Sequence, residues 1–324
     1  MRNKLKSLSI IAAFIGINSL GFCGTLQVDS ELPVYKKVSG VSGTIDSIGS
    51  DTLNNLMTFW SESFREKYPN VKIQIEGKGS STAPPALITG TSQLGPMSRA
   101  MKTIEIEKFE KKYGFQPTKI GVALDSLAVY VHKDNPLNKI SLQEVDAIFS
   151  KTKLGGLNFD ISKWGQMNLT DSWTNKKISI YGRNSASGTY GYFKKKALFK
   201  GDYKNSVKEQ PGSASVVMGI SEDLAGIGYS GIGYKTSSVK ALSISKKKGE
   251  KEFEPNYQNV LKGKYPLGRM LYVYIVKKPN TELPKMTKEF LKFVLSKEGQ
   301  EIVVKDGYLP LTAAISKKQI SLLD

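Results

Sequence analysis

An arginine stands four residues ahead of a Ser-Gly-Thr sequence in the segment Arg183-Asn184-Ser185-Ala186-Ser187-Gly188-Thr189. Arginine offers a planar fork of N–H donors that matches two oxygens of a tetrahedral anion. Ser187 and Thr189 add hydroxyl groups, and Gly188 lets the backbone approach a ligand closely. The apolar spacing of residues 190–199 is typical of a helix, whose first N–H groups lack partners within the helix. The segment predicts an oxyanion-binding loop, with an ordinary helix cap beside a solvated arginine as the alternative.

Three more loops rich in Ser, Thr and Gly precede this one, at residues 49–52, 77–82 and 95–99. The first precedes a helical stripe from Leu53 to Phe64, the second follows the alternating strand pattern of residues 71–76, and the third precedes a charged helix at 103–112. Ligands of open α/β sheets bind at one sheet edge, so we expect the four loops to form one site there. The candidate ligands in the three upstream loops are Ser50, Asp51, Thr52, Ser80 and Ser98.

With these motifs the chain resembles, from about residue 43 to its C-terminus, the phosphate-binding subunit of the bacterial high-affinity phosphate ABC transporter. The family's anion loop, an Arg followed after three residues by Ser-Gly-Thr, matches residues 183–189, and its first-helix loop matches residues 49–52. Its Gly-Ser-Ser loop matches residues 79–81, and the strand and Asn-Pro turn that enter its second domain are similar to residues 128–136. The resemblance implies that the chain binds inorganic phosphate, uses no cofactor, and delivers its ligand to membrane permease subunits.

One position departs from the family's pattern. Some members carry Ser-Asp in the third loop, where the Asp accepts the proton of bound phosphate, and this chain has Ser98-Arg99 instead. Asp51 is the acidic residue that remains among the four loops for this role, unless it is only a solvent-exposed helix cap. Near neutral pH phosphate carries a proton and sulfate does not, so a buried carboxylate favours phosphate. Without such a carboxylate, a sulfate or molybdate receptor is the alternative.

The N-terminus has the pattern of an export signal. Three basic residues lie within residues 1–6, and residues 8–22 form an apolar run that is too short to span a bilayer comfortably. The single cysteine, Cys23, follows this run in a sequence that resembles a loose lipobox, in which Phe22 is larger than the usual small residue. We expect residues 1–23 to be a signal segment and the protein to be periplasmic, with a lipid on Cys23 as its anchor. A plain secreted protein is the alternative.

Composition excludes several other classes of protein. The chain has 47 Lys and Arg against 29 Asp and Glu, a net charge of +18, or +15 without the three basic residues of the signal segment. The lysines are spread along the chain with no recognised nucleic-acid module, so we expect no nucleic-acid partner, although the basic surface leaves an exported adhesin as an alternative. With His132 as the only histidine and no G-x-S-x-G motif, we expect neither an enzyme nor a metal site.

The order of predicted strands and helices divides the chain into two domains. About 300 mature residues exceed one typical domain. We expect a two-lobed α/β fold of the periplasmic-binding-protein class, type II-like, with domain I at residues 35–122 and 271–324 and domain II at residues 123–270. Two crossing strands, Leu124–His132 and Met270–Val276, form the hinge, and closure of a monomer buries the anion. Further predicted helices are residues 142–149, 213–222, 284–295 and 300–304.

Overall fold

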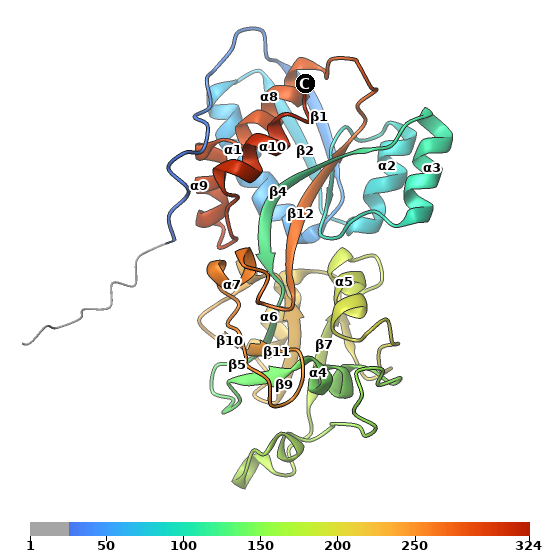
Figure 1. Ribbon diagram of the computed structural model, residues 1–324, viewed down its shortest axis with the longest axis vertical. Coiled ribbons are helices and arrows are strands. Elements are labelled where there is room, and N and C mark those ends of the chain that lie inside the picture. The colour runs from blue at the N-terminus through green and yellow to red at the C-terminus, as the bar shows by residue number, and fades with distance from the viewer. Residues whose placement is uncertain (1–25) are drawn as a thin grey trace, which may run out of the picture.

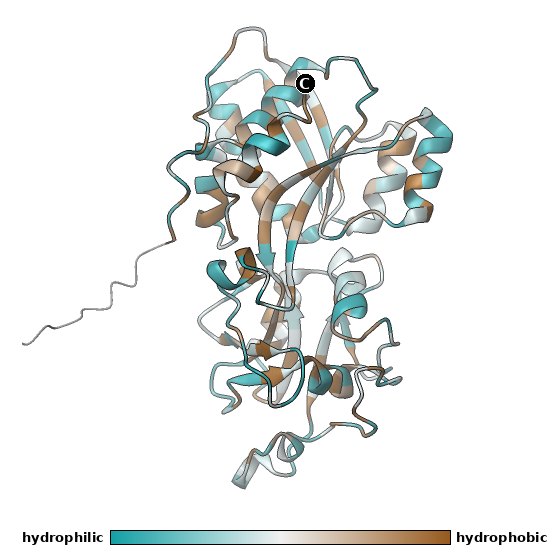
Figure 2. Cartoon of the chain, in the orientation of Figure 1, coloured by the Kyte–Doolittle hydropathy of each residue, from teal (hydrophilic) through white to brown (hydrophobic). Residues whose placement is uncertain are grey.

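The computed structural model describes residues 26–324, which form two lobes joined by a pair of long strands (Figure 1). These strands are β4 (Thr118–Ser126) and β12 (Gly268–Ile275), which pair antiparallel along their whole length. We call this pair the hinge ribbon. It is apolar over most of its length and turns hydrophilic where it reaches the lower lobe (Figure 2). The polar residues at that end are Asp125, Ser126 and Arg269, and all three are buried.

The upper lobe of Figure 1 contains the elements that precede β4 and follow β12. Its remaining strands are β1 (Gly43–Ile48), β2 (Val71–Glu76) and β3 (Gly95–Met97). Its helices are α1 (Asn54–Lys67), α2 (Ala83–Thr89), α3 (Thr103–Tyr113), α8 (Lys285–Val294), α9 (Lys297–Lys305) and α10 (Ala313–Ile320), with short 3₁₀ turns η1 (Asp51–Leu53) and η2 (Ser80–Thr82). β1 pairs in parallel with β2, and β3 pairs antiparallel with β12.

Helix α1 forms because its apolar residues recur on one face. Leu56, Met57, Trp60 and Phe64 of this stripe are fully buried. The Trp60 indole also donates to the Gly299 carbonyl of α9 over 2.8 Å, which satisfies its only polar group. This packing fixes α1 and the η1 turn that precedes it.

The lower lobe is built around a five-stranded sheet in the order β10-β5-β9-β7-β8. These strands are β5 (Ala128–His132), β7 (Ser179–Arg183), β8 (Lys208–Gln210), β9 (Gly226–Ser230) and β10 (Val239–Ala241), and a separate pair consists of β6 (Lys139–Ser141) and β11 (Ser243–Ser245). The helices and 3₁₀ turns are α4 (Leu142–Phe149), η3 (Trp164–Met167), η4 (Asp171–Trp173), α5 (Gly188–Lys196), α6 (Ser213–Ser221), η5 (Ile232–Tyr234) and α7 (Tyr257–Leu261). β7 is parallel to β8 and β9, whereas β5 is antiparallel to β9 and β10.

Several predicted elements are confirmed, and one is wrong. The strand at residues 71–76 and the helix at residues 142–149 have the predicted bounds. The predicted single strand Leu124–His132 is in fact two strands, β4 and β5, separated by Leu127. The Leu127 N–H donates to the Leu267 carbonyl, after which the chain leaves β12 and pairs with β9. The change of pairing strand, from β12 to β9, divides the predicted strand in two. The sequence does not indicate this division, because the residues on both sides of Leu127 are mostly apolar.

The loops predicted to carry the site lie where the two lobes meet. In the upper lobe they follow the carboxyl ends of β1, β2 and β3, and in the lower lobe the loop joins β7 to α5. The lobes are in direct contact here, because the Ser81 N–H donates to the Ala186 carbonyl over 3.1 Å. Gly79, with φ of +112°, allows this approach, since a Cβ at this position would lie 2.6 Å from the Ala186 oxygen.

Candidate functional site

An ion pair between Arg183 and Asp51 joins the two lobes. The Arg183 Nη1 lies 3.0 Å from Asp51 Oδ2, and the Arg183 side chain is 1% exposed. Nη1 also donates to Ser213 Oγ over 2.7 Å, and Nη2 donates to the Pro211 carbonyl over 3.0 Å. Burial lowers the pKa of Arg183, and the negative charge of Asp51 opposes that shift. The guanidinium is held in one orientation by three groups, namely the Asp51 carboxylate, the Ser213 hydroxyl and the Pro211 carbonyl.

Asp51 accepts more hydrogen bonds than a helix cap would. Its Oδ2 accepts from both the N–H and the hydroxyl of Ser213, each over 2.8 Å, at the start of α6 in the other lobe. The Tyr234 hydroxyl donates to the Asp51 carbonyl over 2.9 Å. The interpretation of Asp51 as a plain, exposed N-cap is therefore wrong: its carboxylate points across the interface between the lobes.

One donor of Arg183 has no partner among residues 26–324. The Nε atom is buried and makes no hydrogen bond within this part of the chain. A buried N–H without a partner costs about 1–3 kcal/mol, so native sites rarely keep one without a use. An oxyanion beside Arg183 would accept this hydrogen bond.

Four buried hydroxyl groups form a cluster beside the ion pair. Thr52 Oγ1 lies 2.9 Å from Thr189 Oγ1, Ser98 Oγ lies 3.4 Å from the same atom, and Ser80 Oγ lies 3.2 Å from Ser98 Oγ. None of the four residues is more than 1% exposed. A hydroxyl group can donate or accept by rotating about its C–O bond. The cluster, which we call the hydroxyl cluster, can therefore turn its protons toward an anion without moving a backbone atom.

The other predicted site residues support this cluster. Ser187 Oγ accepts from the N–H groups of Thr189 and Tyr190, so it caps α5. Ser50 is buried, and its N–H donates to the Pro96 carbonyl over 2.8 Å. At Gly188 a Cβ would lie 2.6 Å from Ser98 Oγ and closer still to Ser80 Oγ. Only glycine permits the lobes to meet at that point.

A second arginine, Arg269 on β12, belongs to the site although the sequence pattern does not predict it. Its Nη2 donates to Thr189 Oγ1 over 3.0 Å and its Nη1 to the Ser98 carbonyl over 3.0 Å. Its Nε donates to Oδ2 of Asp125, which stands opposite it on β4, over 2.8 Å. The pair is almost fully buried, with exposed fractions of 2% and 0%. The sequence does contain one indication of this pair: Asp125 is a charged residue within the apolar run at residues 120–127, and a buried carboxylate needs a positive partner.

Ser213 was also missed as a site residue, because the sequence indicates only that a helix starts there. The side chain of Arg99, which replaces the acidic residue of some family members, forms two 2.7 Å hydrogen bonds with Glu105. Its charge is thus matched outside the hydroxyl cluster. The buried set therefore consists of arginine–carboxylate pairs plus neutral hydroxyl groups, an arrangement that can hold a small oxyanion by directed hydrogen bonds.

The two lobes, the hinge ribbon and this buried set of donors define a two-lobed binding protein for a small anion. Residues 36–298 match a family model described as a PBP superfamily domain. The chain is 54% identical over 323 residues to the phosphate-binding protein PstS of Pseudomonas aeruginosa, an alignment that covers 100% of this chain and 99% of that relative. The chain belongs to this family of phosphate-binding proteins.

Solved structures have the same fold. A phosphate ABC transporter substrate-binding protein from Clostridium perfringens, crystallised with bound phosphate, has a TM-score of 0.71 at 25% identity, over 83% of this chain and 100% of that chain. An ABC-type phosphate transport receptor from Vibrio cholerae has a TM-score of 0.63 at 21% identity, over 82% of this chain and 100% of that chain. The predicted α/β two-lobed fold is confirmed.

Proposed function

We propose that this protein captures inorganic phosphate between its lobes and delivers it to a membrane ABC permease. The observation that carries the proposal is the Arg183–Asp51 pair, which spans the interface beside the hydroxyl cluster and keeps a buried Nε–H free within the described chain. Its 54% identity to a phosphate-binding protein over the full chain supports the same ligand. In this role the protein is a carrier and not an enzyme.

Each predicted residue then has a physical role. Arg183 supplies charge and directed donors, and Asp51 accepts the proton of hydrogen phosphate. Gly188 lets the lobes close. The remaining donors, through hydroxyl or backbone N–H groups, are Ser50, Thr52, Ser80, Ser98, Ser187 and Thr189.

The hinge ribbon accounts for capture and release. We infer that residues 35–122 with 271–324, and residues 123–270, move as two rigid bodies about β4 and β12. Contacts between the lobes, such as Tyr234 to Asp51, break on opening and re-form on closing. Opening exposes the hydroxyl cluster to water, so the anion can leave when a permease holds the lobes apart.

Isothermal titration with phosphate, sulfate and molybdate tests this function. We expect phosphate to bind at least about tenfold more tightly than sulfate, because only phosphate can donate a proton to Asp51. Equal binding of sulfate or molybdate would indicate a general oxyanion receptor. Absence of binding to all three would contradict anion capture and favour an adhesin.

We also propose that the protein is exported and works as a monomer held at the membrane by a lipid on Cys23. Cys23 and the signal segment lie outside the described residues. Within residues 26–324 the structure contains no helix that is long and apolar enough to cross a membrane. Mass spectrometry of the protein from its native membrane should show an acylated Cys23 as the first residue. An unmodified N-terminus at another position would indicate plain secretion.

A further inference from the structure

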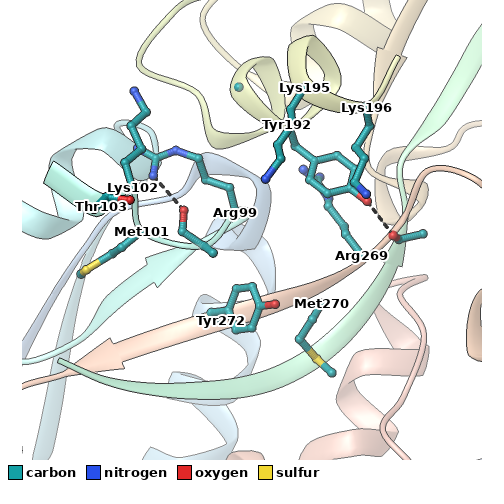
Figure 3. A pocket seen from close by; sticks show the side chains of 13 residues that line it. Arg99, Met101, Lys102, Thr103, Tyr192, Lys195, Lys196, Arg269, Met270 and Tyr272 are labelled. Atoms are coloured by element: carbon teal, nitrogen blue, oxygen red, sulfur yellow. Dashed lines mark hydrogen bonds between the residues drawn. The ribbon is translucent and has the colours of Figure 1, made fainter. Parts of the chain in front are cut away.

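A cavity of about 660 Å³ opens between the lobes (Figure 3). One of its lining residues, Arg269, also donates to Thr189 of the hydroxyl cluster. Three lysines line it: Lys102 from the upper lobe, and Lys195 and Lys196 from the last turn of α5 in the lower lobe. Tyr192, Met270 and Tyr272 supply the apolar part of its wall. We call this cavity, defined by these six residues, the basic groove. Such a volume is typical of sites for organic ligands and far exceeds what a five-atom anion needs.

The basic groove carries a strong excess of positive charge. A second cavity, of about 510 Å³, shares Lys102 and Lys195 with it and adds two more lysines. These are Lys194 of α5, which pairs with Asp202 over 2.8 Å, and Lys200, which follows α5. No residue that lines either cavity in the described chain is acidic. The groove therefore attracts anions.

The three lysines differ from Arg183 and Arg269 in forming no salt bridge among the described residues. Within residues 26–324, Lys102, Lys195 and Lys196 form no salt bridge and their side chains donate no hydrogen bond, and all three are exposed. Figure 3 shows Lys102 on one side of the groove and Lys195 and Lys196 on the other. Closure thus brings like charges together from two lobes. A multiply charged anion between them would remove this repulsion.

The apolar wall suits a flat organic group. The Tyr192 hydroxyl donates to the Gly268 carbonyl over 2.6 Å, which fixes the ring, and the guanidinium of Arg269 lies 5.4 Å from the ring centre. Tyr272 and Met270 come from the hinge ribbon and are half-buried. Aromatic faces and thioethers bind planar groups in many orientations.

We propose that the basic groove is a second binding site, for an organic polyphosphate of nucleotide size. Its phosphate chain binds Lys102, Lys195 and Lys196, and its planar part packs against Tyr192 and Tyr272. The site is separate from Arg183 and Asp51, so it takes its ligand while inorganic phosphate is bound. Because the groove draws on both lobes, its ligand favours the closed arrangement and raises the affinity for phosphate.

Titration of ATP into the phosphate-saturated protein tests this site. We expect ATP to bind, and a Lys102→Ala/Lys195→Ala variant to bind it at least about tenfold more weakly while its affinity for inorganic phosphate in the absence of ATP stays within about twofold. The matched control is Lys111→Ala/Lys112→Ala, which removes the same charge from the exposed last turn of α3, away from the groove. It should bind ATP like the wild type.

A second comparison tests the apolar wall. Tyr272→Leu keeps the wall apolar but removes the aromatic face, so ATP should bind several-fold more weakly and inorganic tripolyphosphate should be unaffected. No ATP binding at millimolar concentration, equal losses in the control variant, or competition between ATP and phosphate would overturn the proposal. So would tripolyphosphate binding as tightly as ATP. Each of these results leaves phosphate capture intact, whereas failure to bind inorganic phosphate would contradict only the proposed function.

Discussion

Asp51→Asn is the substitution that tests how the site tells phosphate from sulfate. Asn has the same shape as Asp and keeps one oxygen, which can still accept the 2.8 Å hydrogen bond from the Ser213 N–H. Arg183, only 1% exposed, loses the carboxylate that lies 3.0 Å from its Nη1. Removing one partner of a buried ion pair costs about 3–5 kcal/mol. A bound anion of either kind would supply the missing negative charge beside Arg183.

The ratio of the phosphate affinity to the sulfate affinity therefore measures the hydrogen bond that only phosphate donates to Asp51. Loss of the ion pair acts on phosphate and sulfate alike, so it cancels in the ratio. The hydrogen bond from hydrogen phosphate to a carboxylate is worth about 1.5–3 kcal/mol and is available only to phosphate. Its loss should reduce the preference for phosphate by roughly 10- to 150-fold.

Equilibrium dialysis with labelled phosphate and sulfate, at one pH and ionic strength, measures this ratio. Asp125→Asn is a matched control, because it makes the same chemical change in the neighbouring pair, where Oδ1 accepts from the Ile232 N–H and Oδ2 from Arg269. It should alter both affinities and leave their ratio unchanged. An unchanged ratio in Asp51→Asn, or an equal fall in Asp125→Asn, would refute the assigned role of Asp51.

Three further predictions concern single groups. Arg183→Ala should weaken phosphate binding at least about thirtyfold by titration calorimetry, and Arg183→Lys should restore it only in part, because lysine is a point charge and not a planar fork. Gly188→Ala should reduce phosphate affinity at least about tenfold by blocking closure, whereas Gly191→Ala in the same helix, whose Cβ would have only ordinary contacts at 3.6 Å, should not. Burial raises the pKa of Asp306 from 3.8 to about 7. The folded state therefore binds this proton more tightly than the unfolded state does, and the free energy of unfolding falls as pH rises from about 4 through 7. Thermal melts should show a smaller loss of stability between pH 5 and pH 8 in Asp306→Asn than in the wild type, and equal losses would contradict the burial effect.

The order of residues along the chain was enough to predict the bounds of helix α4 and strand β2. Helix α4 begins where predicted because Ser141 and Glu144 form a capping box, in which the Ser141 hydroxyl accepts from the Glu144 N–H. Strand β2 was predicted from alternation alone. The division between β4 and β5 could not be predicted, because it depends on a change of pairing partner and both strands are apolar.

The sequence by itself predicted which loops form the proposed oxyanion site, from Arg183 and the Ser-Gly-Thr that follows it and from the three upstream loops rich in Ser, Thr and Gly. The tertiary structure decided which charges face these loops. Asp51 meets Ser213 across 162 residues of chain, and Arg269 meets Asp125 across 144. Such pairs cannot be predicted from the spacing of residues in the sequence, because the partner of a buried charge must be close in the folded structure but can lie at any distance along the chain. Only the closed lobes and the register of the hinge ribbon bring these partners together.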